Sequence, residues 1–298
     1  MKVIEKKYLL AFILITSCFA LWGFANDITN PMVKSFSKIF RMSVTQGALV
    51  QVAFYGGYFC MALPAALFIR RFSYKSGILM GLGLYAIGAL MFLPAASIGS
   101  YWPFLAAYFI LTCGLSFLET SANPFILSMG QPSNATRRLN LAQSFNPIGS
   151  LCGMFVAMNY IQARMNPLST AERATLDDAQ FEALIAADLD VLVKPYAAIG
   201  VVLIVVFVMI LLFVRTNTIT KTKTNHSGSF SRLWNNKAYR EGVVAQFFYV
   251  GAQITCWTFI IQYGTQVFMA EGMAEQAAEV LSQRLNIIAM VLFCCSRF

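Results

Sequence analysis

A carboxylate lies in the middle of a long apolar stretch of this chain, at Glu119 within residues 112–125. Asn123 follows four residues later, which places both side chains on one face of a helix. A charge at the centre of a bilayer costs roughly 2.5–3.5 kcal/mol, and such residues normally face a partner or a cavity. Glu119 is therefore the first candidate for a functional residue.

Polar and aromatic residues recur at helical spacing in four other apolar segments. They are Asn26, Asp27 and Asn30; Tyr55 and Tyr58; Asn140, Gln143 and Asn146; and Gln246, Tyr249, Gln253 and Trp257. One explanation is packing, because polar side chains often hydrogen-bond across membrane helices, at about 0.6 kcal/mol each. The other is a shared cavity in which amides and carboxylates bind hydroxyl groups and aromatic rings stack on a sugar. The whole set favours a small polyol over an ion or a lipid.

Two carboxylates in such a cavity also predict proton coupling. Burial disfavours the charged form of a carboxyl group, so Glu119 and Asp27 could each take up a proton near neutral pH. The alternative for each is a polar packing role without titration. Other chemistry has little support, because the seven Cys lie in apolar segments and the single His226 lies in a polar one. We expect no metal, no cofactor and no enzymatic activity, and no signalling domain is recognisable.

The elements that must position these residues are membrane helices. The chain has 298 residues, of which 58% are hydrophobic and 12% charged, whereas soluble domains are about 25% charged. Helices long enough to span a bilayer are predicted over residues 8–33, 44–69, 76–96, 101–129, 139–161, 192–214 and 240–269. The first could instead be a signal peptide, but its apolar run exceeds the usual 7–15 residues. An eighth helix, from Gln283, is expected to be truncated at Phe298.

The loops suggest a division and an orientation. We predict a six-helix bundle over 1–214, a cytoplasmic linker over 215–240 and the start of a second bundle over 241–298. A cytoplasmic N-terminus places most Lys and Arg residues inside, as the positive-inside rule requires. The net charge of +9 is then a topology signal, and nucleic acid is not an expected partner. The basic turn with Arg70, Arg71, Lys75 and Gly77 is either a topology anchor or a cytoplasmic gate latch.

Several longer motifs resemble the fucose–galactose–glucose:proton symporters of the major facilitator superfamily, and within them the L-fucose permeases. The motifs lie at residues 47–59, 72–77, 118–125, 138–146 and 249–257. The resemblance implies an all-α membrane protein with twelve helices in two halves, of which this chain holds seven and part of the eighth. It also implies alternating access around a central sugar site in the bacterial inner membrane, in a protein expected to be monomeric.

The resemblance assigns roles to residues of this chain. Glu119 matches a carboxylate of the fourth helix implicated in proton coupling and sugar binding, and Gln143 and Asn146 match sugar-facing amides. The expected sugar-binding set is Asn26, Asn30, Tyr55, Glu119, Asn123, Gln143, Asn146, Gln253 and Trp257, and the expected proton-coupling pair is Glu119 and Asp27.

The chain departs from the L-fucose permease pattern in the first helix. That pattern has an aspartate at the position of Asn30, whereas this chain has its acid at Asp27. The predicted function is proton-coupled uptake of a monosaccharide, with L-fucose as the first candidate. The alternatives are an uncoupled sugar facilitator of the same fold and a fragment that does not transport.

Overall fold

The computed structural model describes residues 4–214 and 229–295, and all regular elements in these ranges are helices. The long helices are α1 (Leu9–Thr29), α4 (Leu49–Arg71), α5 (Tyr74–Leu90), α7 (Tyr101–Ser128), α9 (Phe145–Val156), α11 (Asp178–Phe213), α13 (Lys237–Ala270) and α14 (Glu275–Cys295). The short ones are η1 (Lys6–Tyr8), α2 (Met32–Ile39), α3 (Val44–Gly47), α6 (Phe92–Ile98), η2 (Pro132–Asn134), α8 (Ala135–Gln143), η3 (Ala157–Gln162), α10 (Thr170–Ala174) and α12 (Ser229–Asn235).

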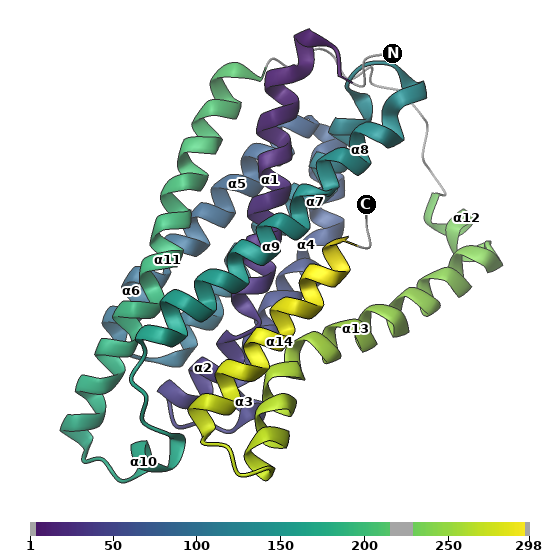
Figure 1. The fold of residues 1–298 in the computed structure, drawn as a ribbon. Coiled ribbons are helices and arrows are strands. Elements are labelled where there is room, and N and C mark those ends of the chain that lie inside the picture. The colour runs from purple at the N-terminus through teal and green to yellow at the C-terminus, as the bar shows by residue number, and fades with distance from the viewer. Residues whose placement is uncertain (1–3, 215–228, 296–298) are drawn as a thin grey trace.

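The first six long helices form one elongated bundle, against which α14 and part of α13 lie (Figure 1). We call the end of this bundle near the N-terminus the proximal end, and the end that carries α2, α3 and α10 the distal end. Five segments of the described chain are long and apolar enough to cross a membrane, or six if the bent α13 counts as one. The predicted class, an all-α membrane protein, is confirmed.

Small residues bring the bundle helices into backbone contact. A Cβ atom at Gly149 of α9 would collide with the carbonyl oxygen of Ala20 in α1, and one at Gly114 of α7 would collide with the backbone of Tyr85 in α5. Only glycine permits these approaches, because the obstructing atoms belong to the backbone and cannot rotate away. These contacts set how closely α9 approaches α1 and how closely α7 approaches α5.

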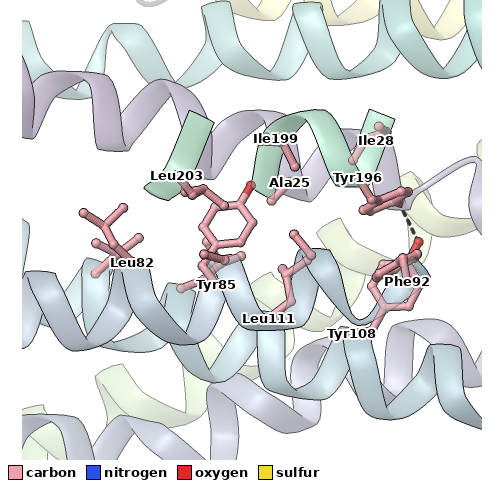
Figure 2. Packing of buried hydrophobic residues seen from close by; sticks show 14 of the residues in the cluster. Ala25, Ile28, Leu82, Tyr85, Phe92, Tyr108, Leu111, Tyr196, Ile199 and Leu203 are labelled. Atoms are coloured by element: carbon pink, nitrogen blue, oxygen red, sulfur yellow. Dashed lines mark hydrogen bonds between the residues drawn. The ribbon is translucent and has the colours of Figure 1, made fainter. Parts of the chain in front are cut away.

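Buried aromatic side chains join α11 to the rest of the bundle near the distal end. Phe92 stacks on Tyr196 with 4.0 Å between ring centroids, and the hydroxyl groups of Tyr108 and Tyr196 lie 2.6 Å apart (Figure 2). Tyr85 donates a hydrogen bond to the Leu21 carbonyl, 3.0 Å away. These hydroxyl groups sit in an otherwise apolar interior, so each needs its partner to offset the loss of water.

The start predicted for the helix over 192–214 is wrong, because α11 begins at Asp178 rather than at residue 192. The Asp177 side chain accepts a hydrogen bond from the Gln180 N–H and caps the helix start. Asp188 and Arg173, both fully buried, form an ion pair of 2.7 Å. Arg41 stacks over Phe181 at 3.4 Å and donates to the Arg173 carbonyl. The acidic segment is therefore an ordered cap over the distal end.

Two other predicted helix boundaries are corrected. The first helix ends at Thr29 rather than residue 33, since Pro31 begins a new turn and α2 follows it from Met32. The eighth helix begins at Glu275 rather than Gln283, so that α14 has 21 residues.

Three more predicted segments differ in detail. The helix predicted over 139–161 is built from α8, α9 and η3, and the one over 76–96 from α5 and α6. In the predicted linker, residues 229–235 form α12 and the preceding residues lie outside the described ranges.

α13 and α14 form a hairpin that meets the first bundle near its distal end (Figure 1). Lys34 of α2 lies 3.5 Å from a carboxylate oxygen of Glu279 on α14, and Gln162 of η3 donates to the other oxygen at 3.5 Å. The side chains of Lys34 and Glu279 are only 13% and 12% exposed. At the proximal end α13 diverges from the bundle, so the two parts are joined distally.

Candidate functional site

Asp27 and Asn30 lie together on α1, as their spacing predicts. The Asn30 amide donates to an Asp27 carboxylate oxygen at 3.1 Å, and Gln51 of α4 donates to the Asn30 carbonyl oxygen at 3.1 Å. All three side chains are buried. Gln51 orients the Asn30 amide so that its N–H group faces Asp27, and the three form one hydrogen-bonded unit between two helices.

A second polar group joins α7 to α8. Gln143 donates to the Asn123 side-chain oxygen at 3.1 Å, and Asn123 donates to the backbone carbonyl of Glu119 at 3.0 Å. Glu119, Asn123 and Gln143 are each half-buried, so water or a ligand can reach them. Asn146 is half-buried as well and donates to the Phe19 carbonyl on α1 at 3.3 Å.

Aromatic residues of α4 lie between these two groups. Tyr55 and Tyr58 stack with 6.4 Å between their centroids, and Trp22 of α1 donates to the Tyr58 hydroxyl at 2.7 Å. Tyr55 and Tyr58 are both half-buried. We call the whole set the polar track: Trp22, Asp27, Asn30, Gln51, Tyr55, Tyr58, Glu119, Asn123 and Gln143.

The two carboxylates of the polar track lie at different depths. Asp27 is eighteen residues from the start of α1 at Leu9, which places it about 27 Å from the proximal end at 1.5 Å per residue. Glu119 is nine residues from the end of α7 at Ser128, or about 13 Å from the same end. The track therefore runs obliquely through the bundle, over a distance much longer than one sugar ring.

Three other predicted site residues are not part of the polar track. Asn26 is half-buried on α1 beside Asp27. Gln253 and Trp257 lie on α13, which packs mainly against α14 and bends by 44° just after Trp257. Their place beside the polar track stays a prediction.

The basic turn after α4 is anchored within the first bundle. Ser73 caps α5 by accepting a hydrogen bond from the Ser76 N–H, and Lys75 donates to the Leu211 carbonyl at the end of α11 at 3.0 Å. A Cβ atom at Gly77 would collide with the Ser121 hydroxyl of α7. Arg70 and Arg71 end α4 at the proximal surface. These contacts test neither the topology-anchor nor the gate-latch interpretation of the turn, and both stay predictions.

Two residues with clear structural roles are not identified by the sequence pattern. Gln51 precedes Tyr55 by one helical turn, and that spacing is the only signal that the sequence offers. Arg138 is fully buried and donates to the carbonyls of Ile126, Leu127 and Gln131, which caps the end of α7. The sequence indicates only a cytoplasmic charge at this position, because nothing in it distinguishes a buried arginine from an exposed one.

Comparisons with known proteins agree with this architecture. The chain is 50% identical to the L-fucose-proton symporter of Haemophilus influenzae over 304 aligned positions, covering all of this chain and 69% of that protein. It is 36% identical to the L-fucose-proton symporter of Escherichia coli, covering 88% of this chain and 61% of that protein. A glucose/galactose transporter of Brucella abortus is 29% identical over 92% of this chain.

A solved structure shares the fold. The crystal structure of FucP, a Major Facilitator Superfamily transporter in the outward conformation, superposes with a TM-score of 0.78 at 33% identity, covering 98% of this chain and 70% of that one. The Major Facilitator Superfamily model matches residues 13–295. An all-helical bundle crossed by a polar track, matched by this family over almost its whole length, shows that the chain belongs to the Major Facilitator Superfamily.

Proposed function

We propose that this chain acts in proton-coupled uptake of a monosaccharide by alternating access, with L-fucose as the first candidate sugar. The observation that carries the proposal is the polar track, in which two carboxylates and several amides surround stacked aromatic rings inside an apolar bundle. Relatives at 50% and 36% identity are named L-fucose-proton symporters, which supports the choice of sugar.

Sugar binding falls to the half-buried part of the track. Asn123 and Gln143 already share a hydrogen bond, so their remaining N–H and C=O groups are held in place for sugar hydroxyl groups. Tyr55 offers a ring face for stacking, and Asn26, Asn30 and Asn146 complete the amide set of the first bundle. Gln253 and Trp257 of α13 would close the site from the other half when the two halves approach.

Proton coupling falls to Glu119 and Asp27. Glu119 is half-buried within the helix α7, and a carboxyl group whose exposure to water changes during transport can gain and lose a proton as it does so. Asp27 is hydrogen-bonded to Asn30, the position at which the L-fucose permease pattern has its aspartate. Because Asp27 and Asn30 are hydrogen-bonded to each other, we propose that Asp27 supplies the carboxylate that the L-fucose permease pattern has at the position of Asn30.

The membrane setting follows from the same reasoning. We propose a bacterial inner-membrane protein with a cytoplasmic proximal end, because Arg70, Arg71 and Lys75 lie there and obey the positive-inside rule. The turn that holds them would act as a gating loop between the halves, and the protein would work as a monomer.

The test uses two independent measurements on the whole chain. Purified protein is titrated with L-fucose, D-galactose and D-glucose while the fluorescence of Trp22 and the other tryptophans is followed. Cells that express the chain are given the same sugars while the pH of the medium is recorded. We expect L-fucose to bind and to make the medium alkaline, as protons enter with sugar.

The variant Glu119→Gln should abolish the alkaline shift and leave sugar binding measurable, whereas the exposed Glu182→Gln serves as the matched control. Uptake without a pH change would instead identify an uncoupled facilitator, and binding without uptake would identify a chain that does not transport. Unchanged proton-coupled accumulation in Glu119→Gln would remove Glu119 from the coupling role. No binding of any sugar would refute the proposed function.

A further inference from the structure

A groove on the outer surface of the first bundle takes no part in the polar track. It lies between α1, α9 and α11 and has a volume of about 680 Å³. Its walls are almost entirely apolar, as Leu21, Phe24, Ile148 and Val202 illustrate. Ile148 and Val202 are 45% and 47% exposed, so the groove opens to the surroundings of the bundle, which in a membrane are lipid. Small residues, including Cys152 and Ala198, leave the space.

The groove spans about one leaflet of a bilayer. Lys194, at one end of it, lies nineteen residues before the end of α11 at Phe213, or about 29 Å at 1.5 Å per residue. The hydrocarbon core of a bilayer is about 30 Å thick, so Lys194 lies at the distal interface when Phe213 lies at the proximal one. Val202 is eight residues from Lys194, about 12 Å toward the midplane, and one leaflet contributes about 15 Å of hydrocarbon.

Charged groups and a tyrosine lie at the distal end of the groove. Tyr160 lines it there, and the Arg164 guanidinium lies 4.2 Å from the centre of the Tyr160 ring. Lys194 lies 2.6 Å from Asp190, and both side chains are more than half exposed. Two cations and one carboxylate leave one net positive charge. A phosphodiester would balance it, and tyrosines are typical of this interfacial level.

We propose that this groove binds one anionic phospholipid of the distal leaflet. An acyl chain lies along the groove from Tyr160 toward Val202, and the phosphate group meets Lys194 and Arg164. An exposed ion pair contributes little, so Lys194 can exchange Asp190 for phosphate at small cost. A zwitterionic headgroup carries its own ammonium group, which competes with the two cations, and it should therefore bind less tightly.

The groove lies on the outer surface of α1 and α9, and none of its lining residues belongs to the polar track, in which the sugar is proposed to bind. The helix face that carries Gly149 packs against Ala20, and both residues also line the groove. A bound chain would fill the space behind this contact and hold together the two helices that carry Asp27 and Asn146. The proposal goes beyond the proposed transport function, and it would hold for this fold whichever sugar is carried.

The test is native mass spectrometry of the whole chain in detergent, with phosphatidylglycerol or phosphatidylethanolamine added and neither sugar nor a proton gradient present. We expect one retained phosphatidylglycerol, bound at least three-fold more tightly than phosphatidylethanolamine. Ala198→Trp, which fills the groove, should weaken phosphatidylglycerol binding at least ten-fold. Ile204→Trp, on a different, exposed face of the same helix and outside the groove, is the matched control and should leave it unchanged.

A second variant tests the charges without altering the packing. The double substitution Lys194→Gln with Arg164→Gln should reduce phosphatidylglycerol binding to the level of phosphatidylethanolamine. Equal retention by Ala198→Trp and Ile204→Trp would show that only annular lipid is bound, and would overturn the groove. Equal binding of both lipids by the unaltered chain would overturn the anionic headgroup. Because lipid retention is measured without transport, either failure is distinct from a failure of the transport proposal.

Discussion

Asp188 and Asp190 lie two residues apart on α11, and each holds one cation, but their surroundings are opposite. Asp188 lies 2.7 Å from Arg173, and these side chains are 2% and 0% exposed. Asp190 lies 2.6 Å from Lys194, and these side chains are 65% and 56% exposed. The same substitution, aspartate to asparagine, thus compares a buried ion pair with an exposed ion pair at nearly the same distance.

Asp188→Asn should destabilise the fold strongly. It removes the charge that compensates Arg173 in the protein interior, and breaking a buried pair in this way costs about 3–5 kcal/mol. Asp188 also accepts a hydrogen bond from the Asn166 N–H at 2.8 Å, so the change weakens the link between the loop and α11. At about 2–4 °C per kcal/mol, the expected fall in the thermal midpoint is on the order of 10 °C.

Asp190→Asn should leave the midpoint unchanged within error, because water and salt already screen this exposed pair. The assay is thermal unfolding of the purified chain in detergent, followed by a thiol-reactive dye that reports exposure of buried cysteines such as Cys18. The double variant Arg173→Met with Asp188→Leu should recover much of the loss, since it removes both charges. Equal midpoints for Asp188→Asn and Asp190→Asn would refute the argument that burial sets the cost.

Three further predictions concern packing, the distal contact and pH. Gly149→Ala should strongly reduce the yield of folded protein, because the added methyl group meets a backbone carbonyl, whereas Gly242→Ala, in open space, should be tolerated; the fraction of monodisperse protein measures both. Lys34→Glu and Glu279→Lys should each increase amide hydrogen exchange in the first turns of α14, and the double reversal should restore protection; failure of the double variant would show that this pair does not hold α14. Burial lowers the pKa of the Lys38 ammonium below its ordinary value of 10.5, and Glu279 opposes that shift. The unfolded chain therefore binds this proton more readily, so stability should rise as the pH increases from the lowered pKa to about 10.5. Lys38→Gln should remove that rise, and an unaltered pH profile would contradict it.

The polar track shows how far spacing alone can carry a prediction. Residues three or four positions apart share a helix face by geometry, so the sequence correctly pairs Asp27 with Asn30 and Glu119 with Asn123. It does not identify Gln51, because that residue acts by donating a hydrogen bond to Asn30 on another helix. Distances between helices cannot be read from spacing along the chain.

The distal cap shows the opposite limit. The segment between the predicted helices over 139–161 and 192–214 is rich in acidic residues, and no helix is predicted there. In the structure Arg173 and Asp188 form a buried ion pair, and α11 starts fourteen residues earlier than predicted. The composition of a segment cannot reveal this, because a buried charge is tolerated only when its partner is already in place.

The sequence by itself determined the membrane class, the approximate positions of most long helices and the helix faces that Asp27 shares with Asn30 and Glu119 with Asn123. Length, hydropathy and helical periodicity are local properties, and the bilayer allows few alternatives to helices. The tertiary structure alone decided that Trp22 meets Tyr58, that Glu279 meets Lys34, and that a groove remains between α1, α9 and α11. These depend on how closely glycines such as Gly149 let helices approach, and that distance is set by all the packed side chains together.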